Sequence, residues 1–311
     1  MQITKSQIER ICKQLKKNPV KYSFLAKGNH NTNYVIKTND GNYILRIENN
    51  SQFKNLTKEY TILKSLKSGL GPKIYFFDHS HKIIPADYFV EEFIEGKHPK
   101  EKLNNSFAKK MARWLKKLHS TRTLSLSECM SKGYYSLSCA IKPYYNNFEK
   151  YHYCLNAELT QTLEILFQKT IKLSKNNDKL FYGLKKFPLL HRDLSKDNIL
   201  ITKDAVKLID WEFAGPGVPE WDLVYFLQSF KHTESQKNLF LKEYGYPNNR
   251  TAKTKLNMIS LLNVCGGIGY SVWRLGLIKE GKLNQKEKHP ALRRLNQDIK
   301  LVKKIIGDLE K

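Results

Sequence analysis

Two short stretches of the 311-residue sequence decide the fold: Leu190-His191-Arg192-Asp193-Leu194-Ser195-Lys196-Asp197-Asn198-Ile199-Leu200 and Leu208-Ile209-Asp210-Trp211-Glu212. Each joins an apolar segment, typical of a short buried strand, to acidic or amide side chains. Asp193 precedes Asn198 by five residues, and Asp210 ends the second apolar segment. A hairpin of these two strands would bring Asp193, Asn198 and Asp210 to one edge.

These three oxygen-bearing side chains suit phosphoryl transfer from ATP. A carboxylate must orient the attacking hydroxyl and accept its proton, and the Mg²⁺ ions that bridge the phosphates take oxygen ligands. One carboxylate would therefore act as the base, and one carboxylate and one amide would hold metal. A single Asp in a turn is usually only turn chemistry. Three such groups in this order, each joined to an apolar strand, favour a phosphoryl-transfer site over simple turn chemistry.

The sequence resembles the aminoglycoside phosphotransferase and choline kinase superfamily, which shares the protein-kinase fold. The pattern H-x-D-L-x-x-x-N-I-L begins at His191, the pattern I-D-W-E begins at Ile209, and Trp221-Asp222-Leu223 follows. The order and approximate spacing are those of the superfamily, and the first pattern has the protein-kinase form. The resemblance extends from about residue 20 to about residue 280, and its details favour bacterial choline kinase-like enzymes.

The resemblance also implies roles for individual residues. Asp193 would be the catalytic base, and Asn198 and Asp210 would bind Mg²⁺. His191 would brace the loop, and Asp222 would fix it from the following helix.

The first ninety-odd residues predict a small β-rich lobe. Asn39-Asp40-Gly41 is a strong hairpin signal between the second and third expected strands. The expected strands are 20–25, 33–38, 43–47, 73–78 and 88–93, and the expected helices are 1–17 and 53–66.

Gly96 and Pro99 mark the boundary with a mostly helical remainder. A helix is expected over 105–119, short β segments between 189 and 209, and further helices from about residue 223. The expected class is α+β with a two-lobed protein-kinase-like fold. Residues 1–93 would form the nucleotide-binding lobe, and residues 94–311 the catalytic and acceptor-binding lobe.

Several residues of the first lobe are candidates for contacts with ATP. The polar loop of residues 27–34 lies where the superfamily places its phosphate-covering loop, so Asn31 and Thr32 could face phosphates. It has one glycine only, which distinguishes it from a protein-kinase loop. Ile44 and Arg46 alternate onto one face of a strand, so Ile44 could lie on adenine while Arg46 grips the phosphates.

Glu59 is the candidate partner that positions Arg46. The segment 89–96 matches the superfamily hinge, where the backbone reads adenine, and Glu92 and Ile94 are the expected contacts.

The acceptor is indicated less sharply. The resemblance to choline kinases suggests an aromatic cage for a quaternary amine. Trp211, Trp273 and Tyr270 are the candidates, with Glu212 adding negative charge. Simple helix packing is the alternative for Trp273. The favoured acceptor is a choline- or ethanolamine-like amino alcohol. A sugar, homoserine, thiamine or an aminoglycoside remains open, as does a non-catalytic nucleotide-binding module.

The net charge of +25 fits either an anionic partner or a lysine-rich composition with scattered charges. Neither zinc spacing nor an RNA-recognition motif is present, so we expect no obligate nucleic acid. Five scattered cysteines and no apolar leader predict a cytoplasmic protein. The apolar stretch 258–278 contains three glycines and several polar residues, so a buried helix pair is expected rather than a membrane span. The oligomeric state is open.

Overall fold

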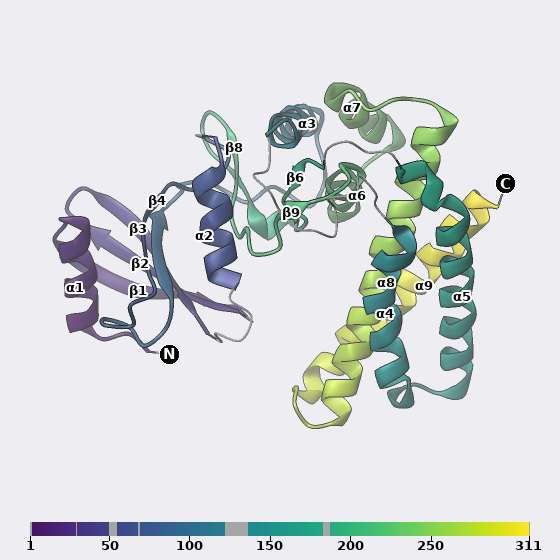
Figure 1. Cartoon of the computed structure of the whole chain (residues 1–311), viewed down its shortest axis with the longest axis horizontal. Helices are drawn as coiled ribbons and strands as arrows, with labels where there is room; N and C mark the ends of the chain where they lie inside the picture. Colours follow the sequence, from purple (N-terminus) through teal and green to yellow (C-terminus); the bar gives the residue numbers. More distant parts are fainter. Residues whose placement is uncertain are drawn as a thin grey trace. The chain divides into compact units, whose positions relative to one another are not determined.

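The computed structural model describes residues 2–28, 30–49, 55–67, 69–121, 136–182 and 187–310. Asn29 of the expected phosphate loop, Phe53 at the expected start of a helix, and Cys129 lie outside the described residues. Two compact units are built from interleaved parts of the chain (Figure 1). Unit 1 comprises residues 1–125, 188–216 and 229–244; unit 2 comprises residues 126–187, 217–228 and 245–311.

Unit 1 contains a five-stranded antiparallel sheet in the order β1-β2-β3-β5-β4. Its strands are β1 (Pro19–Lys27), β2 (Asn31–Thr38), β3 (Gly41–Glu48), β4 (Ile74–Asp78) and β5 (Tyr88–Glu92). Thr38 pairs with Gly41 across the turn Asn39-Asp40, so the predicted hairpin is confirmed. This turn fixes the register of β2 and β3, and therefore decides which side chains share a face.

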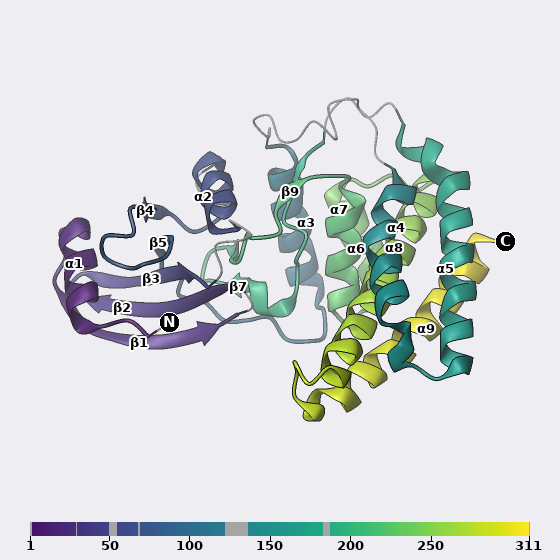
Figure 2. The same cartoon turned by 60° about the horizontal axis from the view of Figure 1, so that its bottom comes forward.

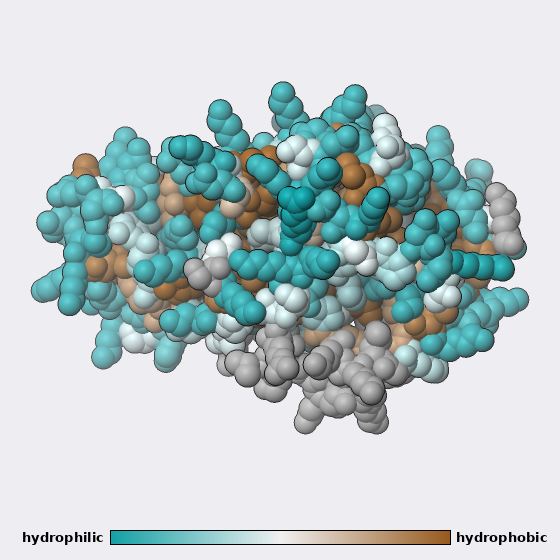
Figure 3. Space-filling view, turned by 90° about the horizontal axis from the view of Figure 1, so that it is seen from above, coloured by the Kyte–Doolittle hydropathy of each residue, from teal (hydrophilic) through white to brown (hydrophobic). Residues whose placement is uncertain are grey.

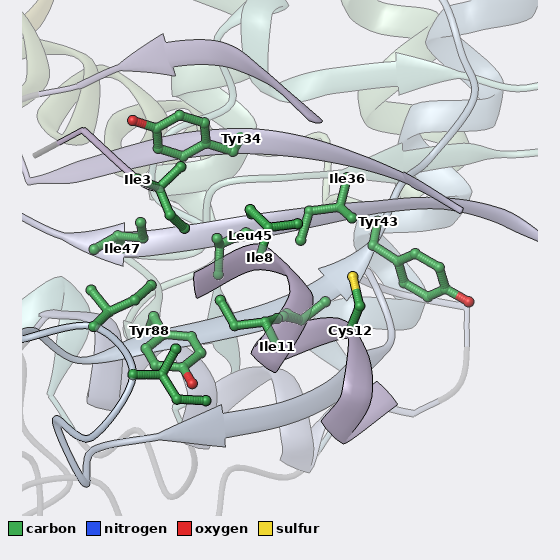
Figure 4. Close-up of a cluster of buried hydrophobic side chains, with 13 residues drawn as sticks. Ile3, Ile8, Ile11, Cys12, Tyr34, Ile36, Tyr43, Leu45, Ile47 and Tyr88 are labelled. Atoms are coloured by element: carbon green, nitrogen blue, oxygen red, sulfur yellow. The ribbon is translucent and has the colours of Figure 1, made fainter. Parts of the chain in front are cut away.

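The first helix, α1 (Lys5–Leu15), begins with a capping box in which the Thr4 hydroxyl accepts from the Gln7 amide. Ile8, Ile11 and Cys12 of this helix are buried. Figure 4 shows them in one cluster with side chains of the sheet. Because α1 covers this face, the opposite face of β2 and β3 remains for other partners.

The rest of unit 1 consists of helices and short strands. The helices α3 and α7 are joined by Arg113 and Glu243 at 2.6 Å and by His119 and the Tyr244 hydroxyl at 2.8 Å. The elements are α2 (Asn55–Ser65), α3 (Asn105–His119), β6 (Leu189–Leu190), η4 (Lys196–Asn198), β7 (Ile199–Ile201), β8 (Val206–Leu208), β9 (Gly215–Pro216) and α7 (Glu234–Tyr244). β6 pairs with β9, and β7 pairs with β8.

Unit 2 is helical in the part that the structure describes. Figures 1 and 2 show α4, α5, α8 and α9 running side by side. The elements are α4 (Leu137–Tyr151), η2 (His152–Cys154), α5 (Ala157–Asn177), η3 (Asp178–Phe181), α6 (Glu220–Ser229), α8 (Arg250–Lys279), η5 (Gln285–Glu287) and α9 (Lys288–Leu309). A sheet in the first part of the chain and helices in the remainder agree with the expected α+β class.

Among the described residues, α8 alone is long and apolar enough to cross a membrane, and 61% of its most apolar window is buried in the protein. The expected helix pair is wrong, because residues 250–279 form one continuous helix. The glycines serve close packing instead. A Cβ added at Gly269 would lie 2.9 Å from the Tyr144 carbonyl oxygen, and one at Gly276 would overlap the Tyr151 ring.

Hydrophilic side chains predominate on the face drawn in Figure 3, and hydrophobic residues show there as separate patches. Outside the grey atoms, this face therefore carries no broad apolar surface.

Candidate active site

The loop after β6 positions Asp193 through Asn198. The Asn198 side-chain amide donates to Asp193 Oδ2 at 2.8 Å and to the Asp193 carbonyl oxygen at 3.1 Å. Asn198 is 9% exposed, at the end of η4. Because its nitrogen faces Asp193, its oxygen points away from that residue and is the atom available to a cation.

Asp210 reaches the same place through the hairpin of β7 and β8. Ile199 pairs with Leu208, and the Ile209 amide donates to the Asn198 carbonyl oxygen at 3.0 Å, so Asp210 follows directly beside Asn198. Its backbone is left-handed, with φ at 63°, a conformation that costs a non-glycine residue free energy. This turn leads the chain out of the strand at Asp210, and the side chain remains 36% exposed.

His191 connects the loop of Asp193 to the segment that precedes Asp210. Its Nε2 lies 3.1 Å from the Ile209 carbonyl oxygen and must donate, because a carbonyl only accepts. Nδ1 is then the acceptor of the neutral ring, and it lies 3.3 Å from the Asp193 amide nitrogen. The ring is fully buried. One imidazole thus ties the backbone of Asp193 to the residue before Asp210.

Arg46 of β3 is the centre of a second group of charges, here called the Arg46 cluster: Arg46, Glu59, Glu91 and Asp210. Nη2 lies 3.1 Å from Glu59 Oε2 and 2.9 Å from Asp210 Oδ1, and Nη1 lies 3.8 Å from Glu91 Oε1. Arg46, Glu59 and Glu91 are each no more than 5% exposed. The other oxygen of Glu59 accepts from the Trp211 amide at 2.9 Å, which joins α2 to the segment after Asp210.

Three carboxylates around one guanidinium leave an excess of negative charge. Burial raises the pKa of Glu91 to about 8, with Arg46 opposing and Glu59 and Asp210 adding to the rise. Burial likewise raises the pKa of Glu59 to about 6, against the effect of Arg46. Burial lowers the pKa of Arg46, but the carboxylates outweigh it and the net shift is upward. The Arg46 Nε–H is buried, and among the described residues it has no hydrogen-bond partner.

Glu91 is the residue that sequence reasoning missed. Ile44 pairs with Glu91 and Arg46 pairs with Phe89, so Glu91 lies diagonally from Arg46 on the same face of the sheet. The signal was the alternation of β5, in which Glu91 and Glu92 point to opposite faces.

The same alternation separates the expected phosphate contacts. Asn31 and Asn33 share the face of Arg46, whereas Thr32 pairs with Ile47 and faces the core. Thr32 is 1% exposed, and its hydroxyl donates to Asn49 Oδ1 at 2.5 Å. The expected contact of Thr32 with phosphate is therefore corrected to a structural role.

The amides of this face remain close to Arg46. With its side-chain oxygen turned toward Arg46, Asn31 accepts from Nη2 at 3.1 Å. Asn33 pairs directly with Arg46, and its Oδ1 is buried without a partner. Ile44 is half-buried on this same face.

The hinge segment begins where β5 ends. The Glu92 amide donates to the Lys73 carbonyl oxygen at 2.8 Å, and a Glu92 carboxylate oxygen accepts from the Lys73 amide at 3.1 Å. Any contact of Glu92 with a ligand would therefore run through its carbonyl oxygen. Ile94 lies two residues on, half-buried in irregular backbone.

Trp211 and Glu212 follow Asp210 in different environments. Trp211 is fully buried, its indole N–H donates to the Leu208 carbonyl oxygen at 3.1 Å, and its ring lies 4.7 Å from that of His191. It has no surface with which to touch an acceptor, so the expected acceptor contact is corrected to a packing role. Glu212 is half-buried, and burial together with Asp210 and Glu59 raises its pKa to about 7.

Tyr270 and Trp273 form an aromatic pair on α8, with ring centroids 5.6 Å apart. Two guanidinium groups, those of Arg274 and Arg294, each lie 5.5 Å from the centroid of the Tyr270 ring. Arg274 also donates to the Tyr270 hydroxyl at 2.9 Å. The ring of Tyr270 is thus already used by cations of the chain, whereas Trp273 is half-buried beside it.

The donor set next to Asp193 was tested for a metal ion. Among the described residues, no group of three or more His, Cys, Asp or Glu is arranged to hold one. Asp210 and Asn198 nevertheless carry hard oxygen donors on segments joined by the bond from the Ile209 amide to the Asn198 carbonyl oxygen, and Asp193 is held to Asn198. Asp210 and Asp193 also contribute to the raised pKa of Glu212, as expected where negative charge accumulates around a cation site. The residues therefore fit a magnesium ion that completes its shell with phosphate and water.

One protein family matches most of this chain. Residues 21–253 match the model of the phosphotransferase enzyme family. A protein LicA homolog of Mycoplasma capricolum is 26% identical over 226 residues, which cover 71% of this chain and 78% of that protein.

Solved structures share the fold. Choline kinase LicA from Streptococcus pneumoniae superposes with a TM-score of 0.68 at 20% identity, covering 96% of this chain and 98% of that one. An ADP-bound aminoglycoside phosphotransferase superposes with a TM-score of 0.63 at 17% identity, covering 96% and 97%. The expected protein-kinase-like fold is confirmed, as is the resemblance to the aminoglycoside phosphotransferase and choline kinase superfamily.

Proposed function

Because the chain belongs to the phosphotransferase enzyme family, we propose that it transfers the terminal phosphoryl group of ATP to the hydroxyl of a small molecule. The observation that carries this proposal is the continuous set of contacts from Asp193 through Asn198 to the segment of Asp210, and from Asp210 to Arg46. It combines a base, two oxygen donors for metal and a buried cation, which phosphoryl transfer requires together.

Asp193 is the proposed catalytic base. The Asn198 amide holds its Oδ2, so the carboxylate is fixed in orientation, and it would orient the acceptor hydroxyl and take its proton as the oxygen attacks the phosphorus. Asn198 and Asp210 would hold Mg²⁺, which neutralises charge on the phosphates when it is bound. His191 keeps both loops in register through its two ring nitrogens.

Arg46 is the proposed phosphate ligand on the nucleotide side. Glu59 and Asp210 fix its Nη2, so the free Nε–H can be presented to an oxygen of the phosphates. Asn31 lies beside it, and Ile44 would lie on the adenine two residues away on the same face. The Glu92 carbonyl oxygen and the Ile94 amide would read the edge of the base. ADP in a solved structure of this fold supports the use of a nucleotide.

Residues 1–93 would thus provide most nucleotide contacts, and residues 94–311 the catalytic loop and the acceptor site. The proposal places the enzyme in the cytoplasm, where ATP is available and its thiols stay reduced.

The favoured acceptor is an amino alcohol such as choline or ethanolamine. The curated LicA homolog and the fold of choline kinase LicA support this choice. Glu212, which keeps a carboxylate near Asp210, and Trp273 are the proposed acceptor contacts. A sugar, homoserine, thiamine or an aminoglycoside would require a different set of polar groups.

A panel of acceptors with ATP and Mg²⁺ tests the proposal. ADP formation would be measured with choline, ethanolamine, thiamine, homoserine, simple sugars and kanamycin, with an acceptor-free reaction as the blank. We expect the largest kcat/KM with choline or ethanolamine. Turnover with another compound of the panel would support the phosphotransferase activity and would replace choline or ethanolamine as the proposed acceptor. Nucleotide binding without turnover on any acceptor would indicate a non-catalytic module.

A further inference from the structure

A cavity of about 700 Å³ opens within unit 2, between the end of α4, η2 and the beginning of α5. All of its lining residues lie between Tyr145 and Ile165, so one helical hairpin builds it. None of the residues proposed above for phosphoryl transfer lines it. We call it the α4–α5 pocket.

The charge of the pocket is opposite to that of the chain. The protein carries 54 Lys and Arg against 29 Asp and Glu, yet no Lys or Arg lines this cavity, whereas Glu149 and Glu164 do. The basic group in the lining is His152, whose Nδ1 lies 2.8 Å from the Glu149 carbonyl oxygen and must donate to it. A pocket with two carboxylates on a strongly cationic protein attracts a cation.

One of the carboxylates is held in place. Glu164 Oε1 accepts from the Tyr145 hydroxyl at 3.1 Å and from the Gln168 amide at 2.8 Å. Burial and the bond to Glu164 raise the pKa of Tyr145, so the phenol stays protonated and continues to donate. The Glu164 carboxylate is therefore held in one orientation before a ligand binds.

Much of the remaining lining is aromatic or apolar, and Thr160 and Gln161 add polar side chains. Tyr145 and Phe148 present adjacent rings with centroids 6.0 Å apart. Tyr153 and Ile165 are 45% and 51% exposed, which is high for large apolar side chains in a cavity lining. Lys279 Nζ already lies 5.0 Å from the centroid of the Tyr153 ring, so the rings of Tyr145 and Phe148 are the ones proposed to face a ligand. Aromatic faces next to carboxylates recognise ammonium groups through cation–π attraction.

We propose that the α4–α5 pocket binds a small organic cation, an ammonium group carried on a compact apolar body. An anion would meet Glu149 and Glu164, and a neutral apolar ligand would desolvate them without compensation. A bare metal ion is a poorer match, because Thr160 and Gln161 add polar groups but aromatic and aliphatic side chains make up much of the remaining lining. The aromatic pair of α8 is a poorer choice, since Arg274 and Arg294 flank Tyr270. This inference does not depend on phosphoryl transfer.

Binding of tetramethylammonium, measured by calorimetry on the full chain without nucleotide, tests the proposal. We expect the double variant Glu149→Gln/Glu164→Gln to raise its Kd at least about tenfold. Glu158→Gln, an exposed change in the first turn of α5 outside the pocket, should leave the Kd unchanged. The neutral isostere 3,3-dimethylbutan-1-ol should bind at least about tenfold more weakly than tetramethylammonium.

Because Glu164 also anchors Tyr145 and Gln168, Glu149→Gln is measured alone as well, since its exposed side chain can be changed without disturbing the fold. A smaller rise in Kd, of about threefold, is expected for it. Equal binding of the neutral isostere, an unchanged Kd in the double variant, or no binding of tetramethylammonium to the wild-type chain would overturn the proposal. A chain inactive on every acceptor that still binds tetramethylammonium in this pattern would refute the proposed function only.

Discussion

Carboxylates outnumber the cation in the Arg46 cluster, whereas cations of the chain lie beside one ring of the aromatic pair of Tyr270 and Trp273. In the cluster, three carboxylates surround one guanidinium, and a buried N–H remains without a partner. In the pair, two guanidinium groups approach the ring of Tyr270. The first arrangement leaves binding capacity for a phosphate and a metal ion. In the second, the ring of Tyr270 is already used by cations of the chain, and Trp273 remains as the proposed acceptor contact.

The difference shows that the order of residues in a motif predicts the geometry of a site, whereas the presence of aromatic residues alone does not. The order Asp193, Asn198, Asp210 fixes geometry, because strand pairing between β7 and β8 allows one register. Aromatic residues late in a helical segment satisfy packing as readily as ligand binding. Variants in both regions can sharpen or break this comparison.

The largest effect is expected from the catalytic loop. Asp193→Ala should lower kcat by about 10³-fold, because it removes the proposed acceptor of the hydroxyl proton, while the affinity for nucleotide is kept. Asp210→Ala should instead weaken Mg²⁺-nucleotide binding at least about tenfold, since it removes a metal donor and a partner of Arg46. Initial rates and nucleotide titrations separate the two effects.

Asp197→Ala is the matched control, because this carboxylate lies in the same loop and is exposed to solvent. It should leave both measurements within about twofold of wild type. Normal turnover of Asp193→Ala would refute the assignment of Asp193 as the base. The Arg46 cluster would then lack a neighbouring catalytic group, and its difference from the aromatic pair would no longer indicate an active site.

Much of this region could be predicted from the sequence, for identifiable reasons. The turn Asn39-Asp40 is a local signal that fixes the β2–β3 register. The alternation of β3 then places Ile44 and Arg46 on one face, and the ion pair of Arg46 with Glu59 is present at 3.1 Å. The loop and hairpin of Asp193 and Asp210 are equally local.

Other features depend on contacts that no local pattern contains. Thr32 is an exception, because extending the predicted strand by one residue from Asn33 places Thr32 opposite Ile47 on the core face. Glu91 required knowledge that β5 pairs with β3 rather than with another strand. The burial of Trp211 depends on helices distant in sequence, among them α3, whose Trp114 ring lies 6.2 Å away.

A smaller effect is expected from Glu91→Gln, and it depends on pH. The pKa of Glu91 is raised from 4.5 to about 8 in the folded chain. Between these values the folded state holds a proton that the unfolded state has released, so this group makes wild-type stability fall as pH rises through that interval. Glutamine does not titrate. The Tm of Glu91→Gln should therefore rise relative to wild type by a few degrees, on the order of one kcal/mol, between pH 5 and pH 9.

Glu92→Gln provides the comparison, because Glu92 lies on the opposite face of β5 and is only half-buried. Thermal melts of Glu92→Gln over the same pH range give the reference for those of Glu91→Gln. If Glu91→Gln and Glu92→Gln behaved alike in thermal melts, the excess of negative charge around Arg46 would not be the property that distinguishes this cluster.

The smallest effect is expected from Tyr270→Phe. The hydroxyl that is removed accepts from Arg274 at 2.9 Å, so its loss removes a contact within α8. Phenylalanine keeps the ring and its packing against Trp273. The KM for choline or ethanolamine should stay within about twofold of wild type, as for other surface substitutions. Trp273→Ala, which removes a proposed acceptor contact, should raise that KM more. A tenfold rise for Tyr270→Phe would mean that an acceptor displaces Arg274, and the aromatic pair would then be a binding site despite its two cations.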